Sequence, residues 1–308
     1  NCRQQGIEPD FTSVDTVGLA RVLLPTLSKF KLNVVAKALN ISQEHHHRAV
    51  DDARVTAEIY VKFIQMLEER GIETLDQMNH FGAHNAEAIR KMPSYHVIVL
   101  AKNDIGRVNL YTLISKSHLE YFGRQPRMPK SEVLKYREGL IIGSACEAGE
   151  LYQAILGEKS AERIARIVNF YDYLEIQPTG NNMFLVRQER CTVKQLQEHN
   201  RKIYELGKKL GKLTVATCDV HFLHPEDAQL RAILQAGQNY SDADQQAPLY
   251  FRTTEEMLKE FEYFGKEIAY ELCVTNPNKI AEMVEKIKPV PDRDQLYSPF
   301  IPLSLIHI

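Results

Sequence analysis

The order of apolar and polar positions divides the chain into a helical first part and a mixed second part. From Ala49 to Gly71, apolar side chains recur three or four residues apart. This spacing predicts an amphipathic helix that ends at a glycine. A shorter helix precedes it, with Ser13 or Asp15 as its cap. The pattern therefore predicts that residues 1 to about 70 are helical.

Beyond a polar segment at residues 72–92, short β-branched runs alternate with helical patterns. Strands that alternate with helices build βα units, so this half is expected to form a parallel sheet or barrel. The expected strands cover residues 94–100, 139–145, 173–177 and 213–217, with a short edge element at 182–186. Among the expected helices are residues 193–210, 254–261, 264–276 and 280–287.

Composition narrows the class of protein. The 308 residues are 44% hydrophobic, which allows a large core in about two domains. A net charge of -2 excludes a basic field over the whole surface but leaves a local basic groove open. The five cysteines show no CxxC spacing, so neither a disulfide framework nor a zinc knuckle is predicted. No signal peptide and no apolar run of about 18 residues occurs, so we expect a cytoplasmic chain without a membrane span.

One candidate site is His47 with Asp52, at the entry and in the first turns of the long helix. An imidazole can take a proton from water while a carboxylate holds a divalent ion, which together suit phosphodiester hydrolysis. The alternative is a helix N-terminus at which Asp51 and Asp52 are favoured by the helix dipole alone. Both interpretations stay open on these residues.

A second candidate site gathers polar groups at strand ends. Asp219 and His221 follow an apolar strand and, if it stays extended, point to the same face. His96 lies in the first strand and Cys146 follows the second. Imidazole, thiolate and carboxylate together favour zinc or a similar ion. A core histidine, a buried thiol and a hydrogen-bonded strand end are the alternatives. Glu175 to Gln177 also end a strand, without an assigned role.

Other chemistries find less support. The chain contains no GxxxxGK[ST], GxGxxG or GxSxG motif, so a P-loop enzyme, a dinucleotide-binding dehydrogenase and an α/β-hydrolase are not indicated. Basic and aromatic side chains mix between residues 102 and 130, as on a nucleic-acid face or on a solvated helix surface. These are Lys102, Arg107, Lys116, Arg124, Arg127 and Lys130 with Tyr111, Tyr121 and Phe122.

The motifs, taken in order, resemble a known family. HHRAVDDARVTAEIY resembles the third motif of the DEDDh proofreading exonucleases. SYHVIVLAKN, GSACEAGEL, YDYLEIQP and CDVHFL, in that order, resemble the PHP domain of bacterial DNA polymerase III alpha subunits. An exonuclease that runs directly into the latter part of a PHP domain resembles the PolC-type alpha subunit. The resemblance covers the chain to about Pro302.

The resemblance implies roles for particular residues. His47 matches the general base of the exonuclease, and Asp52 its last metal-binding aspartate, for Mg²⁺ or Mn²⁺. His96, Cys146, Asp219 and His221 match PHP metal ligands, for Zn²⁺ or Mn²⁺. The partners implied for the parent protein are DNA and replisome components such as the sliding clamp.

The resemblance also implies an α/β fold. We expect the C-terminal part of a ribonuclease H-like exonuclease domain, mostly helical here, followed by a partial PHP-type βα barrel. The expected domains are residues 1–80 (exonuclease), 81–92 (linker) and 93–302 (PHP), with a tail of unclear origin at 303–308. The family's DxE motif, and its first PHP strands with their HxH ligands, are absent here. We therefore expect an internal fragment of a replicative polymerase with 3′–5′ proofreading, itself inactive. A PHP-type metal-dependent phosphoesterase and a structural or interaction module are the alternatives.

Overall fold

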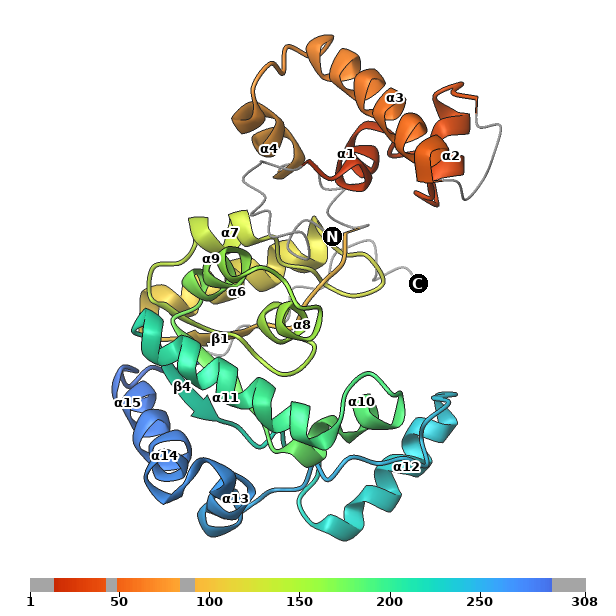
Figure 1. The fold of residues 1–308 in the computed structure, drawn as a ribbon. Helices are drawn as coiled ribbons and strands as arrows, with labels where there is room; N and C mark the ends of the chain where they lie inside the picture. Colours follow the sequence, from red (N-terminus) through yellow and green to blue (C-terminus); the bar gives the residue numbers. More distant parts are fainter. Residues whose placement is uncertain (1–13, 43–48, 84–91, 290–308) are drawn as a thin grey trace, which may run out of the picture. The chain divides into compact units, whose positions relative to one another are not determined.

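The computed structural model describes residues 14–42, 49–83 and 92–289. The chain forms two compact units (Figure 1): Asn1–Ser94 with Thr112–Lys135, and Tyr95–Tyr111 with Tyr136–Ile308. Within the described ranges, no helix is both long enough and apolar enough to cross a membrane.

The first unit has a helical core. The predicted cap is Asp15, whose side chain accepts a hydrogen bond of 2.9 Å from the backbone N–H of Val17. The long helix α3 buries a stripe of apolar side chains spaced four residues apart, and this stripe packs against the first two helices. The helices are α1 (Thr16–Leu23), α2 (Leu32–Ala38), α3 (Ala49–Glu68) and α4 (Leu75–Ala83).

The second unit is built on a four-stranded sheet in the order β1-β2-β3-β4. The strands are β1 (Ile98–Ala101), β2 (Leu140–Gly143), β3 (Tyr173–Ile176) and β4 (Leu213–Ala216). β2, β3 and β4 run parallel, as expected, but β1 pairs with β2 antiparallel. The prediction of an all-parallel sheet was therefore wrong at β1.

Helices cover both faces of this sheet (Figure 1). Leu174 lies on the face that packs against α11 (Val193–Leu210), close to Gly207. Tyr173 and Val215 lie on the opposite face and pack against Ile280 of α15 (Asn276–Glu282). The other described helices of this unit are α8 (Glu150–Leu156), α9 (Ala161–Phe170), α10 (Met183–Arg187), α12 (Ala228–Gly237), α13 (Thr254–Glu260) and α14 (Lys266–Tyr270). α6 (Asp104–Leu119) begins in this unit and ends in the first, and α7 (Lys130–Lys135) belongs to the first.

Two further expectations were wrong. Residues 182–186 were expected as a short edge element, but they form the end of a 3₁₀ turn and most of α10. The helix places the apolar side chain of Leu185 in the core, where it is fully buried. Residues 264–276 and 280–287 were expected as separate helices. The structure instead runs from Lys266 to Glu282 through a π-helical turn at Glu271–Thr275, which lets one continuous helical segment pack on β4.

Candidate metal centre

The direction of β1 brings His96 to Cys146. Since β1 is antiparallel to β2, the residues before β1 lie at the same edge of the sheet as those after β2. The backbone N–H of His96 donates to the carbonyl oxygen of Ala148 at 3.1 Å. Its Nδ1 lies 3.2 Å from Sγ of Cys146, within hydrogen-bonding distance. In a wholly parallel sheet these two residues would lie at opposite edges.

The thiol of Cys146 lies in a partly buried setting. Burial raises its pKa to about 12, and the nearby charges of Glu147 and Asp219 act in the same direction. The thiol is therefore protonated at neutral pH in the metal-free chain, and a cation would have to displace that proton in order to bind sulfur.

Asp219 and His221 form a second pair, but not by strand alternation as expected. β4 ends at Ala216, and Asp219 adopts a left-handed backbone with φ of 55°. This turn brings Nδ1 of His221 to 2.9 Å from the carbonyl oxygen of Asp219 and to 3.8 Å from its Oδ1. The backbone N–H of His221 donates to the carbonyl oxygen of Leu249 at 2.8 Å. A turn therefore brings the two side chains together.

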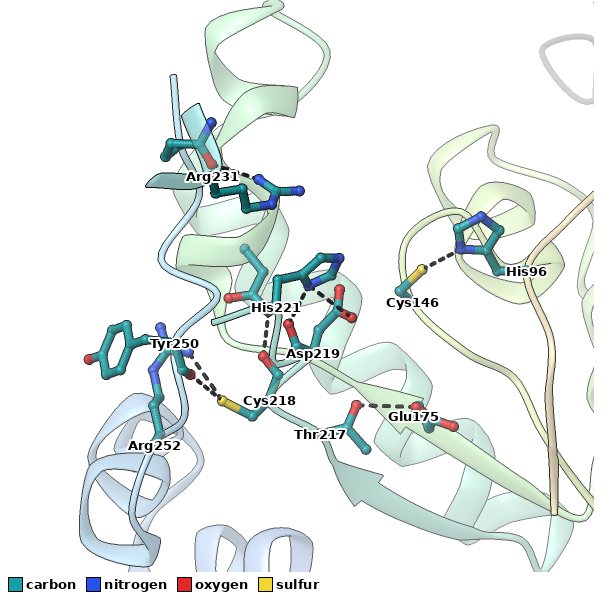
Figure 2. A network of polar contacts seen from close by, with 12 residues as sticks. His96, Cys146, Glu175, Thr217, Cys218, Asp219, His221, Arg231, Tyr250 and Arg252 are labelled. Carbon is teal, nitrogen blue, oxygen red and sulfur yellow. Dashed lines mark hydrogen bonds and ion pairs between the residues drawn. The ribbon is translucent and has the colours of Figure 1, made fainter. Parts of the chain in front are cut away.

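Hydrogen bonds from neighbouring segments hold this turn in place. Figure 2 shows Cys218, Tyr250 and Arg252 among the residues involved. Asn181 Nδ2 donates to the carbonyl oxygen of Cys218 at 3.1 Å, and the Cys218 thiol donates to that of Tyr250 at 3.1 Å. The guanidinium of Arg252, with a side chain only 1% exposed, donates to Cys218 Sγ at 3.4 Å and lies 4.4 Å from the Tyr250 ring centroid. Sequence reasoning missed Asn181 and Arg252, because nothing in their local pattern marks them.

The donor atoms form two pairs rather than one closed group. Figure 2 shows His96, from the segment before β1, beside Cys146, from the segment after β2, and it shows Asp219 with His221 on a third segment, after β4. Among the described residues, no three His, Cys, Asp or Glu side chains are placed to hold one metal ion. The types of donor nevertheless fit a divalent ion such as Zn²⁺ or Mn²⁺.

The exonuclease candidates lie in the first unit. His47 falls outside the described residues. Asp52 lies in the first turn of α3, partly buried, and its carbonyl oxygen accepts a hydrogen bond of 2.7 Å from Thr56 Oγ1. The structure therefore places one of these two residues and leaves their pairing a prediction.

The mixed basic and aromatic segment is partly neutralised by its own carboxylates. Arg107 pairs with Asp104 at 3.0 Å, and Lys116 pairs with Glu120 at 2.8 Å. Both side chains are mostly buried, with Arg107 15% and Lys116 21% exposed, so the two interpretations of this segment stay open.

Comparisons with known proteins agree with the resemblance. A family model for the PHP domain matches residues 35–179. The "DNA polymerase III PolC-type" of Clostridium perfringens is 56% identical over 281 residues, which is 91% of this chain and 19% of that protein. Proteins of the same name from Caldanaerobacter subterraneus and Bacillus subtilis are 52% and 41% identical, each over 94% of this chain.

The chain belongs to the PolC-type DNA polymerase III family. It spans about a fifth of the length of these relatives. In this PolC-type chain, His96 and Cys146 lie inside the range matched by the PHP model, whereas Asp219 and His221 lie beyond it. The expected domain boundaries, at residues 80 and 93, stay a prediction.

Proposed function

We propose that this chain is part of a replicative DNA-directed DNA polymerase with 3′–5′ proofreading activity, which acts on DNA in the cytoplasm. The observation that carries the proposal is the 56% identity to a PolC-type polymerase over 91% of the chain. In the whole protein, residues 1–80 belong to a ribonuclease H-like exonuclease and residues 93–302 to a partial PHP barrel. The sliding clamp is among the proposed partners.

In the proposed exonuclease, His47 takes the proton from the water that attacks the terminal phosphodiester. Asp52 supplies one carboxylate to a Mg²⁺ or Mn²⁺ site. A bound divalent ion stabilises the negative charge that develops on the phosphate. We propose that the isolated chain does not polymerise DNA. We also propose that it has no exonuclease activity, because one aspartate cannot hold a pair of metal ions.

A chimera tests this proposal. The chain replaces the matching segment of the Clostridium perfringens relative, and 3′-end trimming and primer extension are measured together. His47→Ala and Asp52→Ala are each expected to lower trimming by about 10²-fold or more while primer extension persists. Asp51→Ala, one residue away in the same helix turn, is the matched control and is expected to keep both activities. Equal trimming by Asp52→Ala and Asp51→Ala would contradict the assignment.

For the PHP part, we propose a divalent metal centre that stabilises the fold, with His96, Cys146, Asp219 and His221 as its ligands. The contact of His96 with Cys146 and that of Asp219 with His221 support this role. We expect Zn²⁺ or Mn²⁺ to raise the melting temperature of the chain, and His221→Ala to abolish the rise. His224→Asn, a nearby histidine outside the set, serves as the control. A metal-dependent phosphoesterase would instead release phosphate from an aryl phosphate, and His221→Ala would stop that release.

A further inference from the structure

α12 is an amphipathic helix whose apolar side faces outward (Figure 1). The structure describes all 10 residues of this helix, and none of them is buried. Its apolar stripe, formed by Leu230, Ile233 and Leu234, is 61%, 68% and 69% exposed. Helices at the surface of a globular unit normally turn their apolar side inward, so α12 is inverted. The partly buried positions on the inner side are small or polar: Ala228, Arg231, Ala232 and Gln235.

Hydrogen bonds on the inner side fix the helix in this orientation. Arg231 Nη1 donates to Gln246 Oε1 at 2.7 Å, and Gln246 Nε2 donates to Gln235 Oε1 at 2.7 Å. The same Nε2 donates to the carbonyl oxygen of Ala243 at 2.6 Å. Turning the helix over to bury its apolar stripe would break these bonds and leave their polar groups unpaired. The stripe can therefore be covered only from outside the unit.

The chemistry of the apolar stripe points to a protein partner. None of its three side chains is charged, and Leu223 before the helix and Tyr240 after it are also more than half exposed. An uncharged surface offers nothing that binds phosphate groups, which argues against a nucleic acid. Exposed apolar patches on a folded unit mark contacts with other protein surfaces.

The size of the apolar stripe distinguishes between possible protein partners. A helix of this length is about 15 Å long and about 10 Å across, far smaller than the roughly 800 Å² that each partner contributes to a standard interface. A second copy would therefore gain too little from this contact alone. A segment of the same polypeptide needs less area, because the covalent connection keeps its effective concentration high. The chain spans about a fifth of the length of its relatives, so most of such a polypeptide lies outside it.

We propose that the apolar stripe of α12 is a docking surface for the part of the PolC-type polypeptide that lies outside residues 1–308. The stripe packs against an apolar face of that part, and the bonds of Arg231 and Gln235 to Gln246 hold the helix in the orientation that presents it. The contact joins the second unit to the rest of the polymerase in addition to the chain connection. This inference rests on the proposed function, in which the chain is part of a polymerase.

The experiment measures hydrogen–deuterium exchange of the α12 backbone amides in the chain alone and in the chimera with the Clostridium perfringens relative. We expect exchange to be about 10-fold or more slower in the chimera, because a covered helix opens less often. Ile233→Asp places a charge in the middle of the stripe and is expected to abolish this protection. In the chain alone it is expected to change little, since Ile233 is already exposed there.

Val61→Asp is the matched control. It introduces the same charge at another exposed apolar position, in α3 of the first unit, and is expected to keep the protection of α12 in the chimera. Gel filtration of the chain alone reports its oligomeric state, and primer extension by the chimera reports the proposed function.

The outcomes separate this inference from the proposed function. A chimera that extends primers but exchanges at α12 as the chain alone does overturns the docking surface and leaves the function standing. A chimera that protects α12 but extends no primer does the reverse. Protection that survives Ile233→Asp overturns the role of the stripe. If α12 becomes protected in the chain alone as a dimer forms, and Ile233→Asp dissociates that dimer, the occupant is a second copy and the proposal is wrong.

Discussion

The left-handed backbone of Asp219 predicts an inverted effect of glycine at this position. Residues with a side chain pay about 1–2 kcal/mol for this conformation, whereas glycine adopts it freely. We therefore expect Asp219→Gly to be more stable than Asp219→Ala in the absence of metal. The usual order, in which alanine is the more stable, would be reversed.

The magnitude follows from two opposing terms. Glycine saves about 1–2 kcal/mol of backbone strain but loses about 0.4–1 kcal/mol through the greater freedom of the unfolded chain. The net advantage of Asp219→Gly is about 0.5–1 kcal/mol. The contact with His221 does not enter, because both variants remove the carboxylate. For a unit of this size the difference corresponds to about 1–4 °C in melting temperature.

The assay is thermal unfolding followed by circular dichroism, in the presence of a chelator. A matched pair at Lys194 in α11, whose side chain is 83% exposed, supplies the control. There Lys194→Gly should be about 1 kcal/mol less stable than Lys194→Ala. If the order of stability is the same at both positions, the inference of strain at Asp219 is wrong.

Three further predictions concern the packing around the site. Burial would raise the pKa of Glu271, but hydrogen bonds, the largest from Lys208, outweigh it and lower that pKa. Glu271→Gln should therefore cost about 0.5–1 kcal/mol in urea unfolding at pH 7, and this difference should vanish as the pH falls below 4.5 through the lowered pKa. Gly207→Ala should cost about 1–3 kcal/mol in the same assay, because its Cβ would lie 2.3 Å from Thr214 Oγ1. Phe63→Ala should lower the free energy of unfolding of the helical unit by about 3–5 kcal/mol, because this side chain is fully buried. A smaller decrease would show that the surrounding core collapses into the cavity.

The positions of most helices and strands could be predicted from the sequence alone. The helix expected at residues 193–210 matches α11 at both ends, where Thr192 and Gln195 form a capping box and Gly211 adopts a left-handed backbone. Such end signals are local, so they survive any arrangement of the fold. The break expected between residues 276 and 280 was wrong because packing on β4 continues the helical segment there.

The candidate site was predictable in its residues but not in its geometry. Strand-end positions marked Cys146, Asp219 and His221 as polar groups beside an apolar strand. The meeting of His96 with Cys146 depends on β1 running antiparallel, which no local pattern encodes. The burial of Glu175 likewise depends on β2 and β4 both lying beside β3.

The sequence by itself determined the apolar periodicities, the helix ends, the donor types and the likeness to PolC-type polymerases. These depend on the order of residues and on contacts a few positions apart. Only the tertiary structure decided the direction of β1, the turn at Asp219 and the burial of Glu175. Each of these depends on hydrogen bonds and packing between residues far apart in the chain, such as Thr217 with Glu175.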